Sequence, residues 1–323
     1  DFLIREEQTE SREAFFIGQK LDMSRAKKVT HTFLTVFVDS EDGKFRGSAE
    51  KEIHQGISRE EMKQEIDQAL FAAHPWYPIA EPSDAPANDG MPDASRDLTS
   101  ELVKLVQAMQ EIKSEEDSRV NSYEIFVNQK QTRIRNSRGV DVTFSGFDCE
   151  IEVVTSSRKD DHEIEIYKDL RFSDKSAEKI IAEVRGMFHT GRQRLNAVPT
   201  RQNEHADVLL SGDAVGRFFQ YFAMHTNASY QYMGVAKAKI GESITGADAD
   251  PLNIRLVPTL DGSAKNAPYD ETGMPVAERV LFENGICRSY WGSLQHAHYI
   301  GMKDTTSMNN LVVEGGSKTL NEL

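Results

Sequence analysis

The apolar residues of this chain change their spacing several times, and these changes limit the fold more than any other feature. Between Ser122 and Ser156, apolar side chains recur at every second position, which is typical of strands with one buried face. Two turn signals, residues 136–139 and Ser145-Gly146, divide this stretch. The pattern therefore predicts an antiparallel meander of three strands.

Apolar residues at helical spacing occur both before and after this meander. Ser58 and Glu61 have the spacing of a capping box, and the apolar positions that follow predict a helix up to His74-Pro75. Further helices are predicted around residues 102–112 and 173–196, the latter with Ser173 as its cap. Strand-type runs at Ala14–Ile17 and Thr32–Val38 precede them all. The first part of the chain thus combines a sheet with amphipathic helices.

A second unit is predicted to begin near Ala206. Val208–Leu210 has the pattern of a short buried strand, and Ser211-Gly212-Asp213 that of a helix cap. Beyond about residue 240, short β-branched runs alternate with Gly and Pro, which favours strands and loops. The predicted class is α+β, with an N-terminal α/β-type domain over residues 1–200 and a mostly β C-terminal domain over 201–323. Five prolines between residues 75 and 98 predict a long loop.

Composition narrows the possible functions. The 52 acidic and 38 basic residues give a net charge of −14, which opposes direct binding of nucleic acid. No apolar stretch approaches the roughly 18 residues that a membrane span requires, and two cysteines fit a reducing compartment. We therefore expect a cytoplasmic protein. Because the chain starts at Asp1 without a methionine, it is also expected to be a fragment of a longer product.

No complete catalytic set emerges from the residues alone. The H-E-x-x-H, G-x-S-x-G and phosphate-loop motifs are absent. On a strand His296 and His298 would face the same side, but no nearby residue completes a metal site. Lone polar or packing roles are favoured for the remaining candidates, which are His205, His225, Cys149, Cys287, Asp248, Asp250, Asp270 and Glu271. The sequence therefore predicts no catalytic and no metal-binding residue, and the substrate-binding residues stay unknown.

Several short segments follow one another in a set order along the chain: Asn136–Gly139, Val208–Ser211 with the helix Ala214–Phe222, Gly241–Ile244, Asp250-Pro251, Tyr269–Pro275 and Glu283–Ile286. In this order they resemble segments of the TldD/PmbA (TldE) family, which is known as modulators of DNA gyrase and is linked to proteolysis and peptide maturation. Tyr269–Pro275 resembles the family's Phe-Asp-x-Glu-Gly-x-Pro segment, with Tyr for Phe and an inserted Thr. Residues 1–120 match through Glu13–Ile17 and Arg25.

The resemblance also indicates a branch of the family. TldD-like members carry H-E-x-x-x-H on the helix that opens the second domain, and with a later Cys this motif is taken to hold zinc. Residues 213–222 contain neither His nor Glu. The chain therefore resembles the TldE/PmbA branch, which implies a zinc-free subunit of a two-component metalloprotease for unfolded or extended peptides. No cofactor is then expected in this chain, and zinc is expected in a TldD-like partner.

Alternatives remain open at this point. One is a self-sufficient metallopeptidase with an unrecognised metal site, which His296 and His298 would help to form. Another is a non-enzymatic peptide-binding or assembly protein, and both homo- and hetero-oligomers are compatible with the sequence. Relative to the family, the chain is expected to be short by part of its C-terminal half, which includes the region of the TldD-like cysteine.

Overall fold

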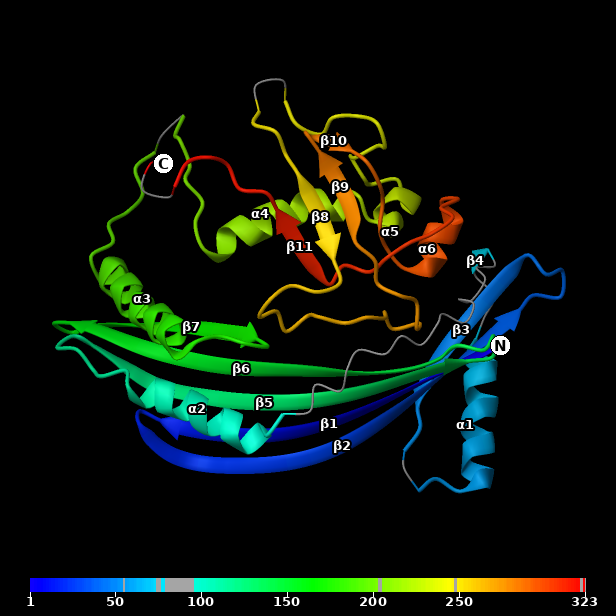
Figure 1. Ribbon diagram of the computed structural model, residues 1–323, viewed down its shortest axis with the longest axis horizontal. Helices are drawn as coiled ribbons and strands as arrows, with labels where there is room; N and C mark the ends of the chain where they lie inside the picture. Colours follow the sequence, from blue (N-terminus) through cyan, green and yellow to red (C-terminus); the bar gives the residue numbers. More distant parts are fainter. Residues whose placement is uncertain are drawn as a thin grey trace.

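The strands of the computed structural model form two antiparallel sheets (Figure 1). The structure describes residues 1–54, 56–73, 77–78, 96–202, 205–246, 249–319 and 322. The larger sheet has the order β4-β3-β2-β1-β5-β6-β7. Its strands are β1 (Phe2–Ile17), β2 (Lys20–Asp39), β3 (Phe45–Glu52), β4 (Tyr77–Pro78), β5 (Ser118–Asn136), β6 (Asp141–Lys159) and β7 (His162–Phe172).

The central strands are longer than the sequence pattern predicts. Strands β5 and β6 pair without interruption past Ser145-Gly146, where Gly146 lies opposite Lys130. The predicted turn at this point, and with it the three-strand meander, is wrong. Backbone hydrogen bonds to β5 hold this glycine in the ladder, and glycine is tolerated inside a strand at some cost in stability. The turn at residues 136–139 is confirmed, and Gly139 has a φ of 95° there.

The two ends of the large sheet are covered on opposite faces. Ile125 and Val127 of β5 pack in a core with the helices α2 (Leu98–Gln110) and α3 (Ala177–Leu195). Ile134 lies on the other face, because it is seven positions after Val127 and nine after Ile125 in a regular stretch of strand, and side chains alternate along a strand. It packs against Tyr269 from the second half of the chain. The same strands therefore supply two separate cores.

The helices of the first half begin and end close to the predicted positions. Helix α1 (Arg59–Ala72) has the predicted capping box of Ser58 and Glu61, and it packs on β2 and β3. Helix α2 confirms the second predicted helix. The cap of α3 is Ser176 rather than Ser173, since the Ser176 hydroxyl accepts a hydrogen bond from the backbone N–H of Lys179.

The second half of the chain forms a smaller unit, which lies above the long strands in Figure 1. Its sheet has the order β10-β9-β8-β11. Its elements are α4 (Asp213–Met224), α5 (Ala228–Tyr232), β8 (Ile254–Val257), β9 (Arg279–Glu283), β10 (Ile286–Cys287), α6 (Leu294–Tyr299) and β11 (Asn310–Val313). A separate core joins Phe219 and Phe222 of α4 to the buried side of this sheet.

Two predictions for the start of this unit are wrong. Val208–Leu210 is exposed and belongs to neither sheet, because none of the described strands pairs with it. Helix α4 begins after Gly212, whose φ is 58°, without any side-chain cap. An apolar run of three residues does not specify burial when no neighbouring strand is available to pair with it.

The α+β class is confirmed by these two sheet-and-helix units. The boundary near residue 200 stays a prediction. Most of the predicted 75–98 loop lies outside the described residues. No helix among the described parts of the chain has both the length and the apolar character that crossing a membrane would require.

Candidate functional site

By the resemblance described above, helix α4 corresponds to the helix on which TldD-like sequences carry their histidines. Ala223 is fully buried, and Phe219 and Phe222 pack against the small sheet. Val215, Phe218 and Tyr221 lie on the outward side and are exposed. The predicted helical face of Val215, Phe218, Phe219 and Phe222 is therefore only half buried. The helix contains no His, Cys or Glu, and Asp213 in its first turn is its one carboxylate.

The histidines do not come together. His296 and His298 lie on helix α6 rather than on a strand, so residues two apart point about 200° away from each other. The predicted common side is wrong. The backbone N–H of Lys237 donates to Nδ1 of His225 over 3.2 Å, and burial together with Lys237 lowers the pKa of His225. His205 is exposed. In the described part of the chain, no three His, Cys, Asp or Glu side chains are grouped to hold a metal ion.

Both cysteines are unreactive packing residues. Burial raises the pKa of Cys149 to about 12 and that of Cys287 to about 11. The thiolate is the nucleophilic form of cysteine. At neutral pH both side chains are therefore neutral thiols inside their cores.

Asp270 fixes the turn that carries the Tyr269–Pro275 segment. Its Oδ1 accepts hydrogen bonds from the backbone N–H groups of Thr272 and Met274 and from the Thr272 hydroxyl. This is the turn-capping role favoured by the sequence. Asp250 is exposed and Asp248 lies outside the described residues.

The turn is inserted against the large sheet by Tyr269 and Gly273. Tyr269 is buried beside Ile134, and its ring centroid lies 5.8 Å from that of Phe144. A Cβ atom at Gly273 would lie 2.6 Å from Cγ1 of Val140. The segment that resembles the family therefore joins the two halves of the chain.

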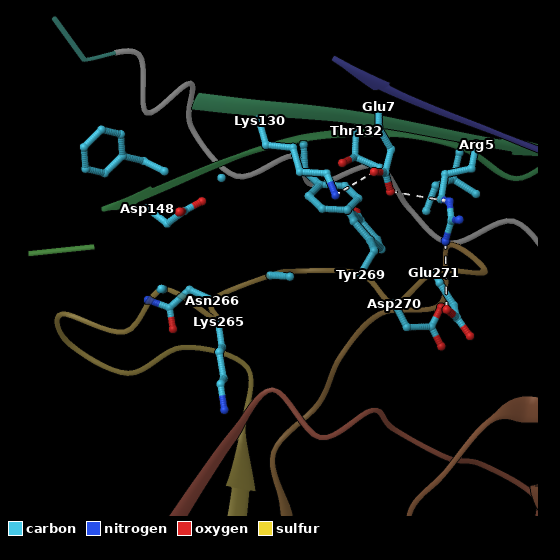
Figure 2. A pocket seen from close by; sticks show the side chains of 16 residues that line it. Arg5, Glu7, Lys130, Thr132, Asp148, Lys265, Asn266, Tyr269, Asp270 and Glu271 are labelled. Carbon is cyan, nitrogen blue, oxygen red and sulfur yellow. Dashed lines mark ion pairs between the residues drawn. The ribbon is translucent and has the colours of Figure 1, made fainter. Parts of the chain in front are cut away.

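Beside this contact lies a half-open cavity of about 280 Å³ between the large sheet and residues 264–271. Its charged groups form a chain of ion pairs, which Figure 2 shows running from Lys130 through Glu7 and Arg5 to Glu271. Nζ of Lys130 lies 2.8 Å from Glu7, whereas the nearest Arg5 and Glu271 atoms are 3.9 Å apart. Ile134, Phe144 and Tyr269 supply the apolar part of its wall.

The sheet surface next to the cavity is acidic. Strand alternation places Glu124, Glu150 and Glu152 on the same face as Asp148, which lines the cavity. Burial raises the pKa of Glu124 and Glu150, and the neighbouring Glu152 carboxylate raises both further. A ligand that reaches the cavity along this face therefore meets a negative potential.

Comparison with known proteins shows which family the second half of the chain resembles. A family model, the PmbA/TldA metallopeptidase C-terminal domain, matches residues 203–323. Residues 203–323 are therefore similar to the PmbA/TldA family. The resemblance to the TldD/PmbA family is thereby confirmed. No curated protein matches the sequence.

Solved structures share the fold over the whole length of the chain. TldE from Thermococcus kodakarensis is 18% identical, with a TM-score of 0.69, over 99% of this chain and 76% of that one. A protein from Thermotoga maritima named a modulator of DNA gyrase is 15% identical, with a TM-score of 0.69, over 99% and 75%. One of the same name from Bacteroides thetaiotaomicron is 17% identical, with a TM-score of 0.68, over 99% and 74%.

The cavity residues of the large sheet were not found from the sequence. Arg5, Glu7 and Lys130 lie on strands whose alternation is visible in the sequence. Alternation shows which side chains share a face of one strand, but it does not show which strands pair. Arg5 meets Ile134 only because β1 and β5 are neighbours in the sheet.

Proposed function

We propose that this chain is the zinc-free, TldE-like subunit of a two-component metalloprotease that acts on unfolded or extended peptides. The observation that carries the proposal is the composition of α4. This helix lies near the start of the PmbA/TldA match, and residues 213–222 contain neither the His nor the Glu that a catalytic relative carries on the corresponding helix. Hydrolysis then depends on zinc held by a TldD-like partner.

Three further observations support this proposal. One of the solved structures with the same fold is named TldE. Among the described residues no three His, Cys, Asp or Glu side chains are grouped to hold a metal ion, and His296 and His298, which the metallopeptidase alternative would use, point apart on α6. The neutral, buried state of Cys287 also argues against a cysteine nucleophile.

Zinc content of the purified chain tests the proposal. We expect the metal to stay well below one zinc per chain after dialysis against micromolar zinc, because α4 contains no His, Cys or Glu. A TldD-like protein treated in the same way serves as the positive control and should retain its zinc. Stoichiometric, chelator-resistant zinc in this chain would instead favour a self-sufficient metallopeptidase.

The expected setting of the protein follows from the same proposal. We infer a cytoplasmic subunit that assembles with another protein and does not bind nucleic acid, since its net charge is −14. A stand-alone peptide-binding protein is a further alternative. It differs in one observable respect, because it would not increase the peptidase activity of any partner.

A further inference from the structure

Arg5 is the unusual group in the cavity between the large sheet and residues 264–271. Its side chain is 20% exposed, and its guanidinium carbon lies 4.9 Å from the centre of the Phe33 ring. The nearest carboxylate oxygens are 3.4 Å away at Glu7, 3.8 Å at Glu50 and 3.9 Å at Glu271. Among the described residues, none of these contacts is a hydrogen bond, and the buried Nε is left without an acceptor.

Each neighbouring carboxylate has other contacts or hydration that explain why it forms no hydrogen bond with Arg5. Glu7 is engaged by Lys130 at 2.8 Å, and Glu50 accepts a hydrogen bond from the Thr35 hydroxyl. Glu271 is 73% exposed and therefore largely hydrated. Among the described residues, this mostly buried guanidinium with five N–H donors has as neighbours the Phe33 ring and carboxylates at ion-pair distance. Buried donors of this kind are usually satisfied by an acceptor.

The shape and charge of the cavity restrict the acceptor that would fit. A guanidinium fork matches a planar carboxylate through two parallel hydrogen bonds. A phosphate would bring about two negative charges beside the carboxylates of Glu7 and Glu271, whereas a carboxylate brings one. Ile134, Phe144 and Tyr269 form an apolar wall beside this position. The cavity volume of about 280 Å³ is close to the lower end of small-ligand sites.

We propose that Arg5 binds the carboxylate of a peptide in this cavity, with an adjacent apolar side chain against Phe144 and Tyr269. Glu271 then acts as a placeholder that the incoming carboxylate displaces into solvent. This inference rests on the proposed function, because it names the peptide class that the subunit holds: peptides with a free carboxylate. The carboxylate comes from the C-terminus or from an acidic side chain.

Fluorescence anisotropy at low salt tests the inference with the full chain alone. The probe is a hexapeptide of five alanines and a final leucine, labelled at its N-terminus and carrying either a free C-terminal acid or an amide. The acid is expected to bind more tightly than the amide by about tenfold or more. A third probe, the amide with one internal glutamate, distinguishes the two sources, since its binding would identify a side-chain carboxylate as sufficient.

Matched variants locate the interaction. Arg5→Gln should remove the preference for the acid, and Arg5→Lys, which keeps the charge and the packing, should weaken it because the fork is lost. Glu271→Gln should strengthen binding of the acid. Arg133→Gln is the control, since Arg133 pairs with Asp141 outside the cavity and should leave binding unchanged.

Equal affinity for the acid and both amide probes, or a preference that survives Arg5→Lys and Arg5→Gln alike, would overturn the inference. Absence of measurable binding by every probe would overturn it too. These outcomes are separate from the fate of the proposed function, because the assay requires neither zinc nor a partner subunit.

Discussion

Replacing Trp291 with alanine is expected to lower the free energy of unfolding by about 4 kcal/mol, within the range for large core side chains. The Trp291 ring is almost completely buried in the core of the small unit. Its Nε1 donates a 2.8 Å hydrogen bond to the backbone oxygen of Ala223, near the end of α4. The substitution removes both the packing and the bond that hold α4 on its sheet.

Urea denaturation followed by far-ultraviolet circular dichroism measures this effect without using tryptophan fluorescence. Trp291→Phe is the matched control, because it keeps an aromatic ring and loses the hydrogen bond. Its expected cost is about 1–2 kcal/mol. If Trp291→Ala cost no more than the Phe variant, the proposed anchoring of α4 through this ring would be wrong.

A second large effect is expected at Gly273, where alanine should destabilise the protein by about 3 kcal/mol. Gly273 has a φ of 84°, which costs a residue with a side chain about 1–2 kcal/mol. Its new Cβ would also lie 2.6 Å from Cγ1 of Val140. Val140 is buried and β-branched, so it cannot turn away easily, and overlap in a packed core typically costs a further 1–3 kcal/mol.

Gly301 provides the control for backbone strain. Its φ is 75°, and a Cβ there would meet nothing within 4 Å. Gly301→Ala should therefore show only the conformational cost, about 1 kcal/mol. The difference between the two variants measures how tightly the Tyr269–Pro275 turn fits the large sheet. Equal losses at both positions would show that the turn does not dock as described.

Local signals predicted the elements of this fold well where short-range interactions determine them. Ser58 and Glu61 bond to each other's backbone within one helical turn, so their spacing alone locates the start of α1. Asn284-Gly285, in the segment Glu283–Ile286, is a local signal of the same kind: it forms the turn between β9 and β10, and both residues have the positive φ values that this turn requires. These features depend on a few consecutive residues.

Features that depend on distant parts of the chain were predicted poorly. Gly146 looks like a turn residue, but pairing with β5 keeps it extended. Val208–Leu210 looks like a strand, yet it lies exposed without a pairing strand among the described residues. Local spacing does not reveal either the presence or the absence of a neighbouring strand.

The candidate site shows the same difference between local features and features that depend on distant parts of the chain. The absence of His and Glu from residues 213–222 was visible in the sequence, and α4 confirms it as a helix. The cavity was not visible, because it combines Arg5, Lys130 and Glu271 from three distant parts of the chain. Asp270 and Glu271 were noticed only as a pair of acids in a turn.

Peptide hydrolysis by a reconstituted pair of subunits tests the central claim most directly. A quenched fluorescent peptide without stable structure is incubated with this chain, with a TldD-like partner, and with both together, each with and without a zinc chelator. We predict no cleavage by this chain alone, and cleavage by the mixture that exceeds that of the partner alone and is abolished by the chelator. Zinc-dependent cleavage by this chain without any partner would contradict the account.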